Sequence, residues 1–171
     1  MGADKADLIA PHVVSALSFL GQTTILGRTP IPGCAFLADQ AEFEGPLPCL
    51  TRFAPSREWV FVASCDLVLL RPAVVTALFS ASGLYDAVIP TADAIPQYLC
   101  GLYRATCFEI LRQNTGLMRV RDWTEKLNVN WLSEGTMSRL EIVPEWCKGA
   151  NTPEELAELQ QIRQHEANTG P

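Results

Sequence analysis

Apolar and polar residues alternate in blocks along the chain, and the pattern inside each block predicts strands and helices in turn. The run Trp59–Cys65 is continuously apolar and rich in β-branched and aromatic residues, a pattern typical of a strand covered on both faces. Pro72–Ser82 begins with proline and is followed directly by Gly83, which are the signals of a helix start and a helix end. These two blocks therefore predict a buried strand followed by a helix.

The carboxyl-terminal helix is the one that the sequence marks most clearly. Thr152 can cap it, Pro153 fits the first helical position and Glu155 completes a capping box. Shorter blocks predict the other elements. We expect helices at Pro11–Leu20, Pro46–Ala54, Ala105–Gln113 and Met118–Leu127, and strands at Thr23–Gly27, Cys34–Asp39, Asp86–Pro90, Gln97–Arg104 and Arg139–Val143.

Alternation of strands and helices predicts an α/β fold with a doubly wound, mostly parallel sheet and helices on both faces. We expect one domain over residues 1–171, with a polar tail after about residue 161. In such folds the ligand binds beyond the carboxyl ends of the strands. Polar residues that directly follow a buried strand are therefore candidates for the functional site.

Two aspartates meet that condition. Asp39 follows the apolar stretch CAFLA, and Asp66 follows WVFVASC. A buried carboxylate without a partner is strongly destabilising, so Asp66 either caps the segment after the strand or holds a cation. The residues alone leave both interpretations open.

Composition sets limits on the function. The chain has 171 residues, of which 48% are hydrophobic and 19% charged, so we expect a full core and no extended disorder. Thirteen basic residues against nineteen acidic residues give a net charge of −6, which argues against non-specific binding to nucleic acid or to an anionic membrane. No apolar run approaches the ~20 residues that a membrane span needs. Any bound phosphate must be held locally, by a few cations, backbone N–H groups or a metal.

The amino-terminal residues lack the features of an export signal. Asp4 and Asp7 lie where a secretory signal would carry positive charge, and Ala6 lies where a myristoylation motif needs serine or threonine. We therefore expect a cytoplasmic protein. Its six cysteines are scattered, without a C-x-x-C pair, and we expect reduced thiols that act as small buried apolar groups.

Several catalytic arrangements are absent from the sequence. His12 and His165 are isolated from any recognisable nucleophile, so a catalytic triad is not expected. Neither a G-x-x-x-x-G-K-[ST] nor a G-x-G-x-x-G motif is present. Taken alone, Lys5 is an ordinary surface charge. Gly45 and Pro46 form a tight turn ahead of a predicted helix, whose amino terminus could meet an anion.

Several short segments, taken in order, carry more information than any one of them. They are M-G-A-D-K-A-D-L (Met1–Leu8), D-Q-A-E-F-E-G-P-L (Asp39–Leu47), E-W-V-F-V-A-S-C-D (Glu58–Asp66), D-A-V-I-P (Asp86–Pro90), I-P-Q-Y-L-C-G-L-Y-R (Ile95–Arg104) and N-T-P-E-E-L (Asn151–Leu156). In this order they resemble the molybdenum cofactor guanylyltransferase family, over a span from Met1 to about Gln160. The resemblance implies a nucleotidyltransferase fold and transfer of GMP from GTP to molybdopterin with Mg²⁺.

The same resemblance implies roles for individual residues. Lys5 would contact the nucleotide phosphates together with the Gly2 backbone, and Asp66 would bind Mg²⁺. Asp39, Gly45 and Pro46 would line the nucleotide site. Asn151 would face the pterin acceptor. Lys5 and Asp66 are thus the expected catalytic residues, and Asp66 is the expected metal ligand.

The sequence departs from the family pattern at several places. The family's leading strand and its G-G-x-S-x-R segment have no counterpart, and we expect that strand to lie between Thr23–Gly27 and Trp59–Cys65. Leu67-Val68 follows Asp66 where the family has x-Pro, and Gly149 stands at the first asparagine of N-x-N-T-P. We therefore expect residues 1–171 alone to be a poor catalyst. A start codon assigned too late and a truncated gene both explain the first departure.

Two alternatives to the guanylyltransferase stay open. One is a sister enzyme of the same fold that uses CTP or another phosphorylated acceptor. The other is a non-catalytic relative that keeps the fold as a binding protein.

Overall fold

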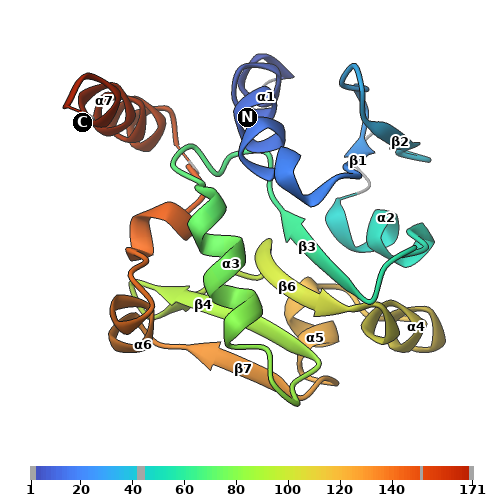
Figure 1. Cartoon of the computed structure of the whole chain (residues 1–171). Helices are drawn as coiled ribbons and strands as arrows, with labels where there is room; N and C mark the ends of the chain where they lie inside the picture. The colour runs from blue at the N-terminus through green and yellow to red at the C-terminus, as the bar shows by residue number, and fades with distance from the viewer. Residues whose placement is uncertain (1–2, 42–44, 151, 170–171) are drawn as a thin grey trace.

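The structure is a computed structural model and describes residues 3–41, 45–150 and 152–169 (Figure 1). The helices are α1 (Ala3–Leu17), α2 (Pro46–Arg52), α3 (Pro72–Ser80), α4 (Ala105–Gln113), α5 (Val120–Thr124), α6 (Glu134–Arg139) and α7 (Pro153–Thr169), with short 3-10 turns η1 (Ser18–Leu20) and η2 (Pro144–Cys147). The strands are β1 (Thr24–Gly27), β2 (Ala35–Ala38), β3 (Trp59–Ala63), β4 (Ala87–Ala92), β5 (Ile95–Pro96), β6 (Cys100–Arg104) and β7 (Val129–Leu132).

The largest sheet has five strands, and three of its four pairings are antiparallel, so the predicted mostly parallel sheet is found only in part. Its order is β3-β6-β4-β5, with β7 on the other side of β4. Strand β6 runs antiparallel to both β3 and β4, and only β7 is parallel to its neighbour. The cause is local. A tight turn with positive φ at Asp93 and Ala94 reverses the chain after β4, and such a turn can join only antiparallel strands.

Helices cover both faces of this sheet, as predicted. Alternate residues of β4 enter different cores: Val88 belongs to one and Ile89 to the other. The first core joins the sheet to α1, α3, α6 and the segment Leu67–Leu70. The second joins it to α2, α4 and α5, with Tyr103 stacked on Trp123 at a ring distance of 4.8 Å. Strands that bury both faces account for the continuous apolar runs in the sequence.

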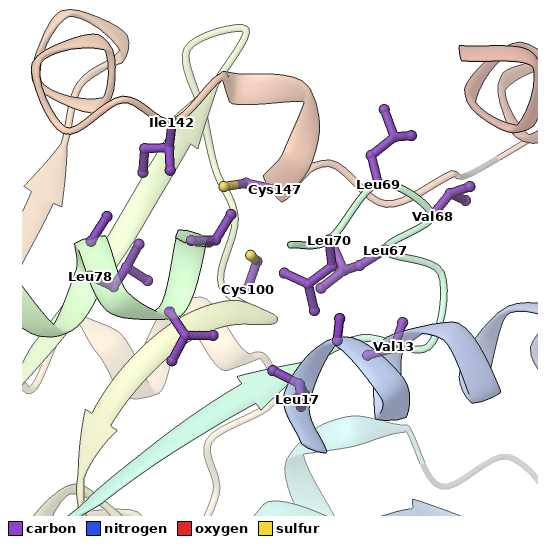
Figure 2. Packing of buried hydrophobic residues seen from close by; sticks show 14 of the residues in the cluster. Val13, Leu17, Leu67, Val68, Leu69, Leu70, Leu78, Cys100, Ile142 and Cys147 are labelled. Carbon is purple, nitrogen blue, oxygen red and sulfur yellow. The ribbon is translucent and has the colours of Figure 1, made fainter. Parts of the chain in front are cut away.

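Figure 2 shows how the first core closes around the chain that follows β3. Val13 and Leu17 of α1 point toward Leu67 and Leu70. Cys100 and Cys147 meet beside them, and both are fully buried. None of the six cysteines, all within the described part of the chain, forms a disulfide. Leu67–Leu70 is therefore fixed by α1, which holds the strand end at Asp66 in place.

Strands β1 and β2 form a separate, parallel, two-stranded sheet. Figure 1 shows this pair apart from the larger sheet, beside α1 and α2. The side chains of β1 are half-buried and most of those of β2 are exposed. The two predicted strands are thus correct, but they do not join the main sheet.

The prediction of a strand at Arg139–Val143 is wrong. Residues Glu134–Arg139 form α6, and the N–H of Ile142 closes the helix end on the carbonyl of Met137 at 3.1 Å. Glu141 has a φ of 58° there, so the apolar residues around it form a helix stop rather than a strand. The strand in this region is β7, which the sequence pattern did not indicate.

The carboxyl-terminal helix confirms its predicted capping box. The Thr152 hydroxyl accepts a hydrogen bond from the N–H of Glu155 at 3.1 Å, and the Glu155 carboxylate accepts one from the N–H of Thr152 at 3.3 Å. Helix α7 continues to Thr169, so the segment predicted as a polar tail is helical. Across the described ranges, no helix has the length and apolar character that crossing a membrane requires.

Candidate functional site

Asp66 lies three residues after the carboxyl end of β3, and its neighbours hold it in place. The Ser64 hydroxyl donates a hydrogen bond to Asp66 Oδ1. The Asp66 carbonyl accepts hydrogen bonds from the N–H of Val68 at 2.9 Å and of Ala150 at 3.1 Å. Within residues 3–41, 45–150 and 152–169, Oδ2 has no hydrogen-bond partner. One oriented carboxylate oxygen is thus available to a ligand.

The carboxylate of Asp66 packs directly on the backbone of Gly149. A methyl group at Gly149 would lie 2.6 Å from Oδ1 and 2.8 Å from Oδ2 of Asp66. Real Cβ atoms do not approach other atoms so closely, so only glycine allows this contact. The segment before α7 therefore forms one wall of the site around Asp66.

The donor set around Asp66 suits a magnesium ion. Mg²⁺ prefers oxygen ligands, keeps several waters, and is commonly bound through one or two carboxylates together with substrate phosphates. Asp66 supplies one such carboxylate, and Ser64 orients it. A protein cage of three or more acidic, histidine or cysteine side chains is absent from the described residues. The site therefore fits an ion that a polyphosphate helps to hold.

Asp39 is the residue directly after β2, and it is held by the start of the next helix. Its N–H donates to the Gly27 carbonyl at 2.9 Å. Its Oδ1 accepts the thiol proton of Cys49 on α2 at 2.9 Å. Arg52 lies behind this contact and donates to the Ala38 carbonyl at 3.0 Å. Asp39 thus has a fixed orientation at the end of the two-stranded sheet.

Gly45 and Pro46 begin α2 beside Asp39. Gly45 has a φ of 74°, a backbone conformation that glycine adopts readily, and Pro46 fits the first helical turn. Both residues line the same cavity as Asp39, and so do Ser64 and Cys65 directly ahead of Asp66. The structure therefore brings Asp39, Gly45 and Pro46 to the same cavity as the end of β3.

A cation near Asp66 is already paired. Lys148, next to Gly149, donates to the Asp93 carboxylate at 2.5 Å. That hydrogen bond raises the pKa of the Lys148 ammonium. Because Asp93 holds it, Lys148 is oriented toward the β4–β5 turn.

The amino acid sequence matches one family model over most of its length. Residues 6–131 match the model described as the MobA-like NTP transferase domain. The chain belongs to the family of MobA-like NTP transferases. This membership makes it a nucleotidyltransferase by descent and confirms the resemblance found in the sequence.

Two relatives carry more specific names. The chain is 31% identical over 185 residues to a probable molybdenum cofactor guanylyltransferase of Nostoc sp., covering 94% of this chain and 84% of the relative. It is 26% identical over 143 residues to a molybdenum cofactor guanylyltransferase of Desulfosudis oleivorans, covering 77% and 70%.

Solved structures of low identity share the fold. Molybdopterin-guanine dinucleotide biosynthesis protein A of Archaeoglobus fulgidus aligns with a TM-score of 0.62 at 21% identity, over 77% of this chain and 69% of that one. The 2-C-methyl-D-erythritol 4-phosphate cytidylyltransferase of Thermus thermophilus aligns with a TM-score of 0.67 at 11% identity, over 95% of both. The α/β nucleotidyltransferase fold is thus shown, with the partly antiparallel sheet described above.

Two residues expected in the site of this MobA-like transferase, Gly2 and Asn151, lie outside the described part of the chain. The third, Lys5, belongs to α1, and its side chain is not described. Their roles stay predictions.

Two residues of the site were not found by sequence reasoning. Ser64 orients Asp66, and its position two residues before Asp66 was the available signal. Gly149 packs on Asp66, but it lies 83 residues away in the chain. Only its departure from the family's asparagine drew attention to it.

Proposed function

We propose that this MobA-like transferase moves GMP from GTP to the terminal phosphate of molybdopterin and releases pyrophosphate. The observation that carries the proposal is Asp66. Its carboxylate is oriented by Ser64 at the end of β3, and one of its oxygens has no protein partner among the described residues. The names of the two relatives supply the guanine nucleotide and the acceptor.

The chemistry requires positioning more than acid or base groups. An oxygen of the acceptor phosphate attacks the α-phosphorus of GTP, and the bond from that phosphorus to the β-phosphate oxygen breaks as pyrophosphate leaves with the electron pair. The attacking phosphate is already anionic at neutral pH, so it needs no general base. In-line placement and charge neutralisation account for the rate in such transfers.

Each residue then has a role in binding or orientation. Asp66 holds Mg²⁺, which when bound neutralises phosphate charge. Ser64 and the Gly149 backbone fix the Asp66 carboxylate. Lys5 contacts the phosphates, together with the Gly2 backbone.

The remaining residues bind the two substrates. Asp39, Gly45 and Pro46 form the nucleotide wall, and Asn151 binds the acceptor. A net charge of −6 makes local neutralisation essential, because the overall field repels a polyphosphate.

Calorimetry with GTP and Mg²⁺ tests the proposal. We expect wild-type protein to bind GTP only with Mg²⁺ present. Asp66→Asn should not show this Mg²⁺-dependent GTP binding, because asparagine keeps the size of the side chain without its charge. Glu109→Gln on the exposed face of α4 is the matched control and should bind as wild type. Equal Mg²⁺-dependent binding by Asp66→Asn would contradict the metal role.

Two further measurements test the base and the reaction. CTP in place of GTP tests the base, and tighter binding of CTP would favour the sister cytidylyltransferase. Pyrophosphate release on adding molybdopterin tests transfer itself. Binding of GTP without any release of pyrophosphate would identify a non-catalytic relative.

A further inference from the structure

The side chain of Cys49 lies between Asp39 and Arg52. Its thiol donates to Asp39 Oδ1 at 2.9 Å, and Nη2 of Arg52 donates to its sulfur at 3.4 Å. Cys49 is 2% exposed and lines the same cavity as Asp39. The three side chains thus form a connected series of hydrogen bonds that ends at the Asp39 carboxylate.

Helix α2 sets the position of the Cys49 thiol. Cysteine has one rotatable bond before its sulfur, which therefore lies in one of a few staggered positions. A thiol is ordinarily a weak donor, but its hydrogen bond to an ionised carboxylate is charge-assisted and stronger than a bond between neutral groups. Cys49 can therefore orient Asp39 with less loss of side-chain entropy than a long polar side chain.

Arg52 supports this contact from the other side of the sulfur. The same Nη2 also donates to the Ala38 carbonyl at 3.0 Å, which holds the guanidinium group against the end of β2. Successive hydrogen bonds in a series polarise one another. A cation that donates to the sulfur of Cys49 therefore makes its S–H group a better donor to Asp39.

This arrangement leaves one oxygen of Asp39 for a ligand. Oδ1 accepts from Cys49, whereas Oδ2 has no hydrogen-bond partner among residues 3–41, 45–150 and 152–169. An ionised carboxylate only accepts hydrogen bonds, and it repels a phosphate group. The part of a nucleotide that Oδ2 meets is therefore an N–H or O–H donor of the base or the ribose.

We propose that Cys49 is a positioning residue for nucleotide binding: its thiol, supported by Arg52, holds Oδ1 of Asp39 so that Oδ2 accepts a hydrogen bond from the bound nucleotide. This inference rests on the proposed function, which places Asp39 in the nucleotide wall. Cys49 acts through Asp39 and takes no part in the transfer itself. Its loss therefore weakens nucleotide binding and leaves the Asp66 carboxylate in place.

Infrared spectroscopy tests the contact without any nucleotide. A thiol that donates a hydrogen bond has a lower S–H stretching frequency than a free thiol. The band of Cys49 is obtained by subtracting the spectrum of Cys49→Ala from that of the wild type. We expect this band to move to higher frequency in Asp39→Ala and to stay in place in Asp66→Ala. An unchanged band in Asp39→Ala would overturn the proposal.

Calorimetry with GTP and Mg²⁺ tests the role in binding. Because hydrogen bonds to charged groups are among the stronger ones, we expect Cys49→Ala to bind GTP about tenfold more weakly. Cys49→Ser keeps a donor and should restore most of the affinity. Cys107→Ala is the matched control, since Cys107 is also buried and its thiol donates to the Asp86 carbonyl at 3.2 Å. It should bind GTP as wild type does.

A double-mutant cycle tests whether the effect passes through Asp39. In an Asp39→Ala background, Cys49→Ala should change GTP affinity by less than about twofold, and a full tenfold loss there would refute the route. With 2′,3′-dideoxy-GTP, which lacks both ribose hydroxyls, Cys49→Ala should lose affinity only if the donor lies on the base. If Cys49→Ala does not fold by circular dichroism, Cys49→Val takes its place, because valine fills the space of the thiol without a donor.

The wild-type protein separates this inference from the proposed function. If wild type binds GTP with Mg²⁺ and Cys49→Ala binds it equally well, the positioning role is refuted and the guanylyltransferase stands. If wild type binds no GTP while the infrared shift is present, the proposed function is refuted, and with it the role of Cys49 in nucleotide binding.

Discussion

Replacing Gly149 by alanine tests the contact between the Gly149 backbone, ahead of α7, and the Asp66 carboxylate at the end of β3. The added methyl group would lie 2.6 Å from Asp66 Oδ1 and 2.8 Å from Oδ2. Ordinary contact begins at 3.4 Å, so the two groups must separate by about 0.8 Å. The φ of Gly149 is not in the positive range that favours glycine, so the methyl group itself is the only obstacle.

The expected effect has two parts, and they are measured separately. Overpacking of this kind typically destabilises by ~1–3 kcal/mol, which urea denaturation detects. Displacement of a positioned group by ~1 Å can lower the rate of a transfer ~100-fold. We therefore expect slower pyrophosphate release and a lower unfolding free energy in Gly149→Ala.

A double-mutant cycle identifies the cause. Asp66→Ala removes the carboxylate that the methyl group would meet, so Gly149→Ala should be nearly neutral for stability in that background. Coupling of this kind is expected only between residues in contact. If Gly149→Ala destabilises equally with and without the Asp66 carboxylate, the contact is not the reason for glycine at this position.

Further predictions concern stability and reactivity. Thr152→Ala removes the cap of α7 and should cost about 1 kcal/mol, or a fall of ~2–4 °C in Tm by calorimetry; no shift would mean that the helix does not depend on this cap. Burial and the charges of Arg163 and Arg71 lower the pKa of His12 below 6.5, so the unfolded chain binds more protons in acid. Unfolding free energy should then fall as pH drops below 6.5, and a His12→Asn variant with the same pH dependence would contradict this. Burial raises the pKa of Cys107 to about 12, so iodoacetamide at pH ~8 should modify its thiol only after unfolding, and rapid native labelling by mass spectrometry would refute that assignment.

Local signals in the sequence predicted many of the elements. The apolar run Trp59–Cys65 contains β3, and the proline at position 72 starts α3. Thr152 and Glu155 form their capping box. Each of these signals acts within a few residues, so one sequence is enough to identify it.

Strand direction and partner choice could not be predicted in this way. The sheet is partly antiparallel because the turn at Asp93 and Ala94 reverses the chain. Asp93 is a usual turn residue, but a single turn residue does not indicate which strands pair or in which direction. Strand β7 carries Asn130, whose side chain donates to the Ala81 carbonyl at 2.8 Å. Asn130 interrupts the apolar pattern expected of a buried strand. Its hydrogen-bond partner lies 49 residues away, so the local sequence does not predict that the side chain is paired.

In the candidate site, too, local features could be predicted from the sequence and tertiary contacts could not. Asp39 and Asp66 were predicted because each directly follows a strand, a local property. Their surroundings depend on the tertiary fold: Cys49 donates to Asp39, and Gly149 packs on Asp66. Whether these residues bind nucleotide and metal stays a prediction that the binding experiments test.

The reversal between β4 and β6 also bears on the order in which the molecule folds. Val88 and Leu102 pair across a short connection, whereas Trp59 and Arg104 are about forty-five residues apart when they pair in the same sheet. The entropy lost in closing a loop grows with its length, and contacts near in sequence form sooner. We therefore expect the β4–β6 hairpin to form first and β3 and β7 to pair with it afterwards.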